Sequence, residues 1–145
     1  MIQNQTAVPF FKPSIDEEDR ANIASVLDSG WLTTGRWCKT FEKKFADYIG
    51  VKHCIAVNSA TAALHLSVAA SGIRHDEYVI VPTMTFASTA EILYYQGIRP
   101  ILIDCNQKDL TLSESDTRKK LLQAQREGKK VRGIIPVHYA GKMVS

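Results

Sequence analysis

Small hydrogen-bonding residues interrupt the apolar segment CIAVNSATAALHL, residues 54–66. An apolar run ends just before residues 58–61, Asn-Ser-Ala-Thr, and an alanine- and leucine-rich run follows them. In open α/β sheets, anions bind where a strand ends and a helix begins, because the first N–H groups of a helix lack partners. Ala60 and Thr61 would offer such N–H groups, and Ser59 and Thr61 would offer hydroxyls. The pattern therefore predicts a phosphate site, although a purely structural helix cap has the same sequence.

A second junction of this kind, PTMTFAST at residues 82–89, places Phe86 among small polar residues. If the two junctions are neighbours, Phe86 would cover one face of a flat ring whose phosphate lies at Thr61. A core phenylalanine in the first turn of a helix explains the same pattern, and the sequence leaves both interpretations open.

Motifs for other nucleotide, metal or hydrolase chemistry are missing from the sequence. It contains no G-x-G-x-x-G, no G-x-x-x-x-G-K-[ST] and no G-x-S-x-G. The histidines lack metal-ligand spacing and have no Cys–His cluster beside them, so we expect no metal site. They are His53, His65, His75 and His138.

Composition is that of an ordinary globular protein of 145 residues, with 45% hydrophobic and 23% charged residues. A formal charge of +3, scattered along the chain, gives no sign of a nucleic-acid partner. No apolar run approaches the length of a membrane span, and the polar start is not a signal peptide. The three cysteines are an odd number without a C-x-x-C pair, which favours a reducing cytoplasm.

Strands and helices are expected to alternate from residue 53 onward. Apolar runs predict strands at 53–57, 78–81, 100–104 and 132–137, and helical patterns predict helices at 61–70, 86–95 and 113–126. Two helices, at 14–28 and 41–49, should precede them, the first with a capping box from Ser14 to Glu17. The helix at 61–70 is apolar on nearly all sides, so we expect it to be buried. This order predicts an α/β fold of three αβα layers around a mostly parallel sheet.

Five ordered motifs resemble the sugar aminotransferases of the DegT/StrS family. They are SGWLTTG (29–35), F-E-x-x-F-A-x-Y-I-G (41–50), AVNSATAALHL (56–66), VIVPTMTFASTA (79–90) and IIPVHYAG (134–141). The resemblance covers essentially the whole chain. It implies a fold-type I enzyme that uses pyridoxal 5'-phosphate (PLP) to aminate keto-sugar nucleotides for surface polysaccharides, lipid A and related amino-sugar products.

The resemblance also implies roles for particular residues. Ser59, Ala60 and Thr61 would bind the PLP phosphate, with Ala60 in place of a commoner glycine, which is tolerable if the position is helical. Phe86 would stack on the pyridine ring. Trp31 and Thr33, in the glycine-containing loop, would lie near the sugar-nucleotide pocket. Residues 1–52 would form a helical segment with this substrate loop, and residues 53–145 a partial PLP-binding large domain.

The chemistry of the family needs residues that this sequence does not show. Glutamate is the usual amino donor, a lysine forms a Schiff base, and a carboxylate pairs with the pyridine nitrogen. None of the eleven lysines lies in the family's S-x-H-x-x-K context, so no catalytic residue is assigned. We therefore expect the N-terminal portion of a homodimeric aminotransferase, truncated after residue 141 as by a frameshift or premature stop. An inactive module that binds phosphate or another subunit is the alternative.

Overall fold

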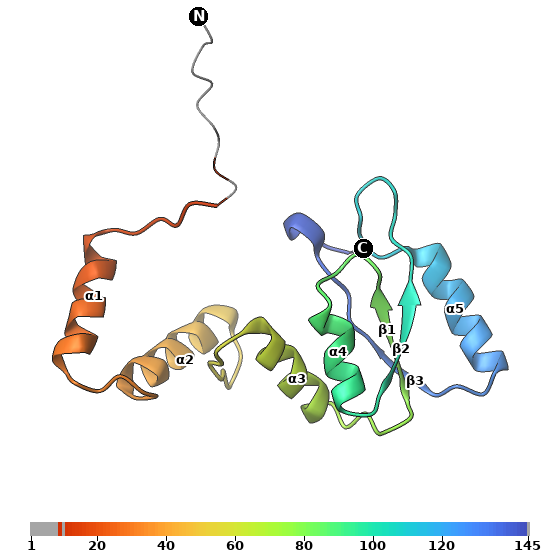
Figure 1. Ribbon diagram of the computed structural model, residues 1–145, viewed down its shortest axis with the longest axis horizontal. Helices are drawn as coiled ribbons and strands as arrows, with labels where there is room; N and C mark the ends of the chain where they lie inside the picture. The colour runs from red at the N-terminus through yellow and green to blue at the C-terminus, as the bar shows by residue number, and fades with distance from the viewer. Residues whose placement is uncertain (1–8, 10, 145) are drawn as a thin grey trace, which may run out of the picture. The chain divides into compact units, whose positions relative to one another are not determined.

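The computed structural model describes residue 9 and residues 11–144 of the chain (Figure 1). They form two compact units, which meet in the sequence between Ala56 and Val57.

The first unit contains two helices, α1 (Glu17–Asp28) and α2 (Arg36–Ile49). The capping box of α1 lies two residues beyond the predicted one. Asp16 accepts a hydrogen bond from the N–H of Asp19, and the Asp19 side chain accepts one from the N–H of Asp16. Aspartate caps a helix as well as serine does, so the predicted box from Ser14 to Glu17 is wrong and Asp16 is the N-cap. Helix α2 begins at Arg36, earlier than the predicted start at residue 41, and ends at Ile49 as predicted; its C-cap, Gly50, has a left-handed φ of 77°.

The second unit holds the sheet and the remaining helices. Its elements are α3 (Ala60–Ala70), β1 (Tyr78–Pro82), α4 (Ser88–Tyr95), β2 (Arg99–Ile103), α5 (Glu114–Arg126), β3 (Val131–Ile134) and the 3₁₀ turn η1 (Tyr139–Gly141). The strand order is β2-β1-β3, and β1 is parallel to both neighbours. Helix α4 contacts β1 and β2, α5 contacts β2 and β3, and α3 contacts α4. Figure 1 shows the sheet between α4 on one side and α5 on the other, so the predicted α/β architecture is confirmed.

The predicted strand at residues 53–57 is wrong, and the sheet has three strands instead of four. A strand is defined by its hydrogen bonds to a neighbour, and both edges of the central strand β1 are already occupied by β2 and β3. Residues 53–57 pair with no strand in the described part of the chain. Apolar composition alone therefore did not produce a strand there.

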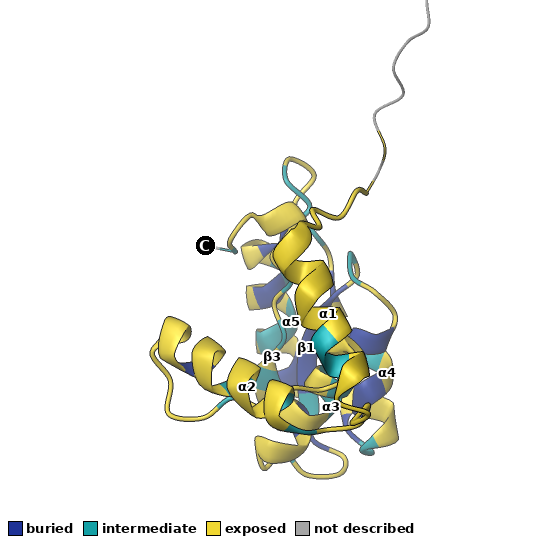
Figure 2. Ribbon diagram, turned by 90° about the vertical axis from the view of Figure 1, so that its left-hand side faces the viewer, coloured by how far each residue is buried: buried dark blue, intermediate teal, exposed yellow. Residues whose placement is uncertain are grey.

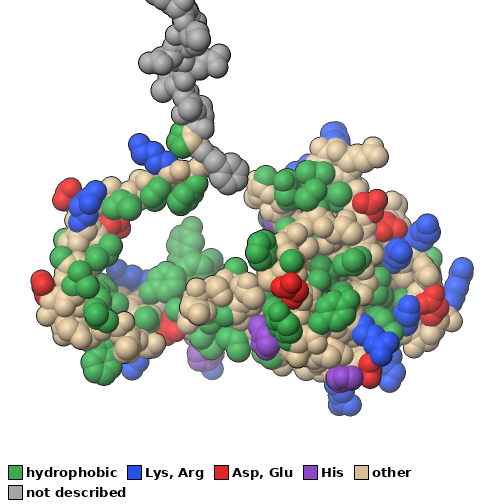
Figure 3. Space-filling view, in the orientation of Figure 1, with side chains coloured by type: hydrophobic (Ala, Val, Ile, Leu, Met, Phe, Trp, Pro, Cys, Tyr) green, Lys and Arg blue, Asp and Glu red, His purple; other side chains and the backbone are tan. Residues whose placement is uncertain are grey.

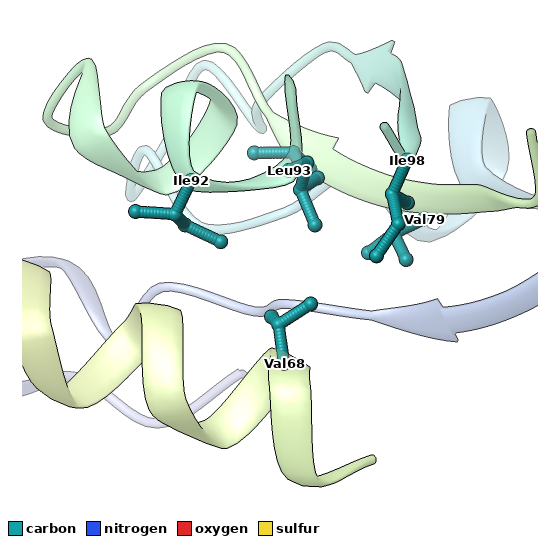
Figure 4. Close-up of a cluster of buried hydrophobic side chains, with 6 residues drawn as sticks. Val68, Val79, Ile92, Leu93 and Ile98 are labelled. Carbon is teal, nitrogen blue, oxygen red and sulfur yellow. The ribbon is translucent and has the colours of Figure 1, made fainter. Parts of the chain in front are cut away.

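The hydrophobic core of the second unit lies between the sheet and helices α3 and α4. It is built from Val68 of α3, Val79 and Val81 of β1, Ile92 and Leu93 of α4, and Ile98. In Figure 4, Val68 points across from α3 toward the side chains of α4 and β1. Each of these side chains is at most 7% exposed. The core therefore ties α3 to the sheet through α4.

Replacing Ile92 with alanine should lower the free energy of unfolding by about 3 kcal/mol, because it removes a fully buried side chain and leaves a cavity. The matched control is Ile134→Ala, since Ile134 is 45% exposed at the end of β3 and should cost about 1 kcal/mol or less. Urea unfolding followed by circular dichroism measures both. Equal losses for the two variants would contradict this assignment of the core.

Helix α3 is less buried than its sequence predicts. Within α3, which the structure describes in full, only Val68 is buried, while Leu66 is 52% exposed. Figure 2 shows α3 mostly in the colour of exposed residues, whereas α4 carries several buried ones. Contact with α4 covers only one side of a helix that is apolar on nearly all sides.

Candidate functional site

The first turn of α3 is capped in a way that leaves two backbone donors free. Ser59, the N-cap, has an extended backbone (φ −160°, ψ 157°), and its Oγ accepts a hydrogen bond from the N–H of Ala62 at 3.1 Å. Its carbonyl accepts one from the N–H of Ala63 at 3.1 Å. The N–H groups of Ala60 and Thr61 have no acceptor in the described part of the chain. Two donors at the positive end of a helix dipole fit an anion such as a phosphate.

Side chains in residues 58–61, which we call the phosphate loop, are small and exposed. The Ser59 hydroxyl donates to Oδ1 of Asn58 at 3.4 Å, a long hydrogen bond that a phosphate oxygen can replace. Ala60 is the first residue of α3 and its φ is not positive, so this position does not require a glycine. The predicted residues Ser59, Ala60 and Thr61 thus form one accessible surface.

Phe86 lies on the turn between β1 and α4, with 77% of its surface exposed. Its carbonyl accepts a hydrogen bond from the N–H of Thr89 at 3.0 Å. This exposure excludes a core role for Phe86 within the unit, which was one of the two interpretations of the sequence. Stacking of Phe86 on a ring whose phosphate lies at Thr61 stays a prediction.

Trp31 and Thr33 line the same pocket in the first unit, at the connection between α1 and α2. The pocket has a volume of about 760 Å³, and its lining includes the basic residues Arg36 and Lys39. Neither basic side chain makes a salt bridge in the described part of the chain. A pocket with an indole and two cations suits a ligand that carries both a flat ring and negative charge.

The indole of Trp31 is held in place by its own loop. Its Nε1 donates to the carbonyl of Thr34 at 3.0 Å, and its backbone N–H donates to Oγ of Ser29 at 3.2 Å. A Cβ on Gly35 would lie 2.7 Å from Cδ1 of Trp31, so the close approach of the ring requires glycine there. Gly35 was not among the predicted site residues, although its place four residues after Trp31 in SGWLTTG could have indicated it.

An ion pair joins the segments that follow β2 and β3. Nζ of Lys142 donates to Oδ2 of Asp109 at 2.6 Å. This hydrogen bond, together with bonds from the Thr111 hydroxyl and N–H, holds the pKa of Asp109 well below its ordinary value. Lys142 is thereby engaged by a carboxylate at the edge of the sheet where the parallel strands end.

Among residues 9 and 11–144, no group of three or more His, Cys, Asp or Glu residues is arranged to hold a metal ion. No helix in those residues combines the length and the apolar character that crossing a membrane requires.

Comparison with known proteins gives one consistent result. The model of the DegT/DnrJ/EryC1/StrS aminotransferase family matches residues 13–145. A DegT DnrJ EryC1 StrS aminotransferase from Brucella abortus is 31% identical, with a TM-score of 0.80 over 87% of this chain and 34% of its own. The PLP form of Spr1654 from Streptococcus pneumoniae is 31% identical, with a TM-score of 0.81 over 95% of this chain and 34% of its own.

Helicobacter pylori PseC, an aminotransferase involved in the biosynthesis of pseudoaminic acid, is a third similar structure. It is 30% identical, with a TM-score of 0.78 over 92% of this chain and 34% of its own. The chain therefore spans about a third of the length of the solved structures that it matches.

Proposed function

Because the chain belongs to the DegT/DnrJ/EryC1/StrS aminotransferase family, we propose that it forms the phosphate-anchoring part of a PLP-dependent sugar aminotransferase. The whole enzyme would move an amino group from glutamate to a keto-sugar nucleotide. The observation that carries the proposal is the pair of free N–H groups, from Ala60 and Thr61, at the start of α3. PLP forms of similar structures agree with a cofactor that has a phosphate to anchor.

Each predicted site residue has a task in this proposal. The N–H groups of Ala60 and Thr61 and the hydroxyl of Ser59 bind the phosphate of PLP. Phe86 covers one face of the pyridine ring and excludes water from it. Trp31 and Thr33 hold the sugar nucleotide in their pocket, where nearby cations balance its phosphates. PLP, when bound, supplies the electron sink that amino transfer needs.

The cellular setting is proposed with the activity. Residues 1–52 would serve as a helical segment with the substrate loop, and residues 53–145 as part of the PLP-binding large domain. The enzyme would work in the cytoplasm as a homodimer and supply amino sugars for surface polysaccharide, lipid A or a related product. The PseC of Helicobacter pylori, which works in pseudoaminic acid biosynthesis, supports a sugar-related role.

A second candidate function is a module that binds phosphate or another subunit without performing chemistry. The exposed aromatic side chains of α2 favour it, since Phe41 is 54% and Tyr48 is 85% exposed. Figure 3 shows hydrophobic side chains on the surface along the α1 and α2 segments. The two candidates predict the same phosphate site and differ in whether amino transfer follows.

Titration with PLP and with pyridoxal, which lacks the phosphate, tests the proposal. PLP should bind at least about tenfold more tightly, because each hydrogen bond to a charged group contributes roughly 1.5–3 kcal/mol. Thr61→Leu should abolish this preference by placing a bulky side chain over the phosphate loop. Ser67→Leu is the matched control, since Ser67 is exposed in the second half of the same helix. Equal affinities for PLP and pyridoxal would contradict the proposal.

A further inference from the structure

Two threonines flank Phe86 on the turn before α4, and their side chains contact each other. Oγ1 of Thr85 lies 2.8 Å from Oγ1 of Thr89, within hydrogen-bond distance. Thr89 is 4% exposed and belongs to the first turn of α4, whereas Thr85 is half-buried on the turn. The bond therefore attaches the residue just before Phe86 to the buried start of a helix.

This arrangement departs from what a helical threonine commonly does. A threonine hydroxyl in a helix often bonds to the backbone carbonyl four residues earlier. Thr89 instead bonds to the side chain four residues earlier. The N-cap of α4, Ala87, makes no side-chain capping bond, so the hydroxyl pair is a side-chain bond at a helix start that lacks a capping side chain.

Backbone bonds on both sides of Phe86 complete the turn. The N–H of Thr85 donates to the carbonyl of Thr83 at 3.1 Å, and the N–H of Thr89 donates to the carbonyl of Phe86 at 3.0 Å. Phe86 nevertheless keeps its side chain 77% exposed. A ring that is mostly exposed gains little fixation from packing, and the hydroxyl pair fixes the turn that carries it.

We propose that Thr85 and Thr89 are positioning residues that hold Phe86 ready to stack on the flat ring of a ligand. The identity of that ligand, PLP, rests on the proposed function. The inference that the turn is fixed does not depend on which ligand binds. It rests on the 2.8 Å contact between the hydroxyls of Thr85 and Thr89. Fixing the ring before binding strengthens binding, because the ligand no longer has to order the turn.

Thr89→Val tests the inference because it removes the hydroxyl while keeping the shape of the side chain. It should weaken PLP binding about fivefold, the usual scale for one neutral hydrogen bond. Competition by inorganic phosphate, which needs only the phosphate loop, should not change. Thr89→Ser should restore affinity, and Thr85→Val should match Thr89→Val without adding to it in the double variant. Thr83→Val is the control, since the Thr83 hydroxyl makes no hydrogen bond in the described part of the chain.

Amide hydrogen exchange of residues 83–90 provides a readout that does not need a ligand. Exchange should become faster in Thr89→Val and Thr85→Val, and stay unchanged in Thr89→Ser and Thr83→Val. Unchanged exchange in both valine variants, or an equal loss of PLP and phosphate binding, would overturn the inference. Faster exchange in a chain that binds neither PLP nor phosphate would support the positioning role and contradict the proposed function instead.

Discussion

Replacing Ala60 with proline is expected to weaken the binding of phosphate and PLP about thirtyfold, because it deletes one hydrogen bond to a charged group, worth roughly 2 kcal/mol. The substitution suits the position unusually well. Ala60 is the first residue of α3, where proline is favoured and its missing N–H breaks no bond of the helix. Ser59 already has the extended backbone that a residue before proline prefers. The fold should therefore survive while one phosphate donor is lost.

Ala60→Gly is the matched control, since glycine keeps the N–H and its small size allows equally close approach to the backbone. It should bind phosphate like the original chain, although the helix loses some stability. Competition of inorganic phosphate with PLP, followed by fluorescence, measures both variants, and thermal unfolding checks that both are folded. Unchanged affinity in a folded Ala60→Pro chain would mean that phosphate binds elsewhere.

Much of the second unit could be predicted from its sequence because its signals are local. The strands β1 and β2 lie within a residue of their predicted bounds, and α5, with Ser113 as its N-cap, begins one residue after the predicted start and ends at Arg126 as predicted. The apolar run of β1 is buried along almost its whole length, which makes it the central strand. The side chains and caps of these elements carried enough information to place them.

Predictions failed where an element depends on a distant partner. Residues 53–57 have the composition of a strand but no neighbouring strand in the described part of the chain. Helix α3 has the composition of a buried helix, yet its main contact is with α4 and only Val68 of its residues is buried. Composition shows what a segment is able to bury, and only the arrangement of the other elements shows whether it does.

In the candidate site, too, the features set by neighbouring residues were predictable and the contacts between side chains were not. The phosphate loop was predictable because a cap and two free donors are properties of four consecutive residues. The contact of Trp31 with Gly35 and the bond between Thr85 and Thr89 also join residues four apart in the sequence. Their residue types do not distinguish these pairs from other pairs at the same spacing. Side-chain geometry was needed to show which of many such pairs are in contact.

The 145 residues alone are expected to make no amino sugar from glutamate and a keto-sugar nucleotide. Amino transfer in this family needs an uncharged lysine beside the cofactor, and no lysine of this sequence lies in the family's context. Lys142 follows β3 at the edge of the sheet where the phosphate is expected, so it is the lysine to test. Its ammonium group donates to Asp109 at 2.6 Å, and the lowered pKa of Asp109 shows that this carboxylate is stabilised in its charged form. A lysine whose Nζ is engaged in an ion pair with a carboxylate is poorly placed to attack PLP.

Mass spectrometry of reaction mixtures with PLP, glutamate and a keto-sugar nucleotide measures this prediction directly. The product should stay at the level of a blank without protein, whereas a full-length member of the family, assayed in parallel, should form it. Borohydride reduction of the chain with one equivalent of PLP should leave no stoichiometric adduct on Lys142, and Lys142→Arg should bind PLP as the original chain does. Amino-sugar product above the blank, or a stoichiometric adduct at Lys142, would show that these residues already contain the missing chemistry. PLP binding without product is expected, because the free N–H groups of Ala60 and Thr61 can donate to a phosphate, whereas no lysine of this sequence lies in the family's context.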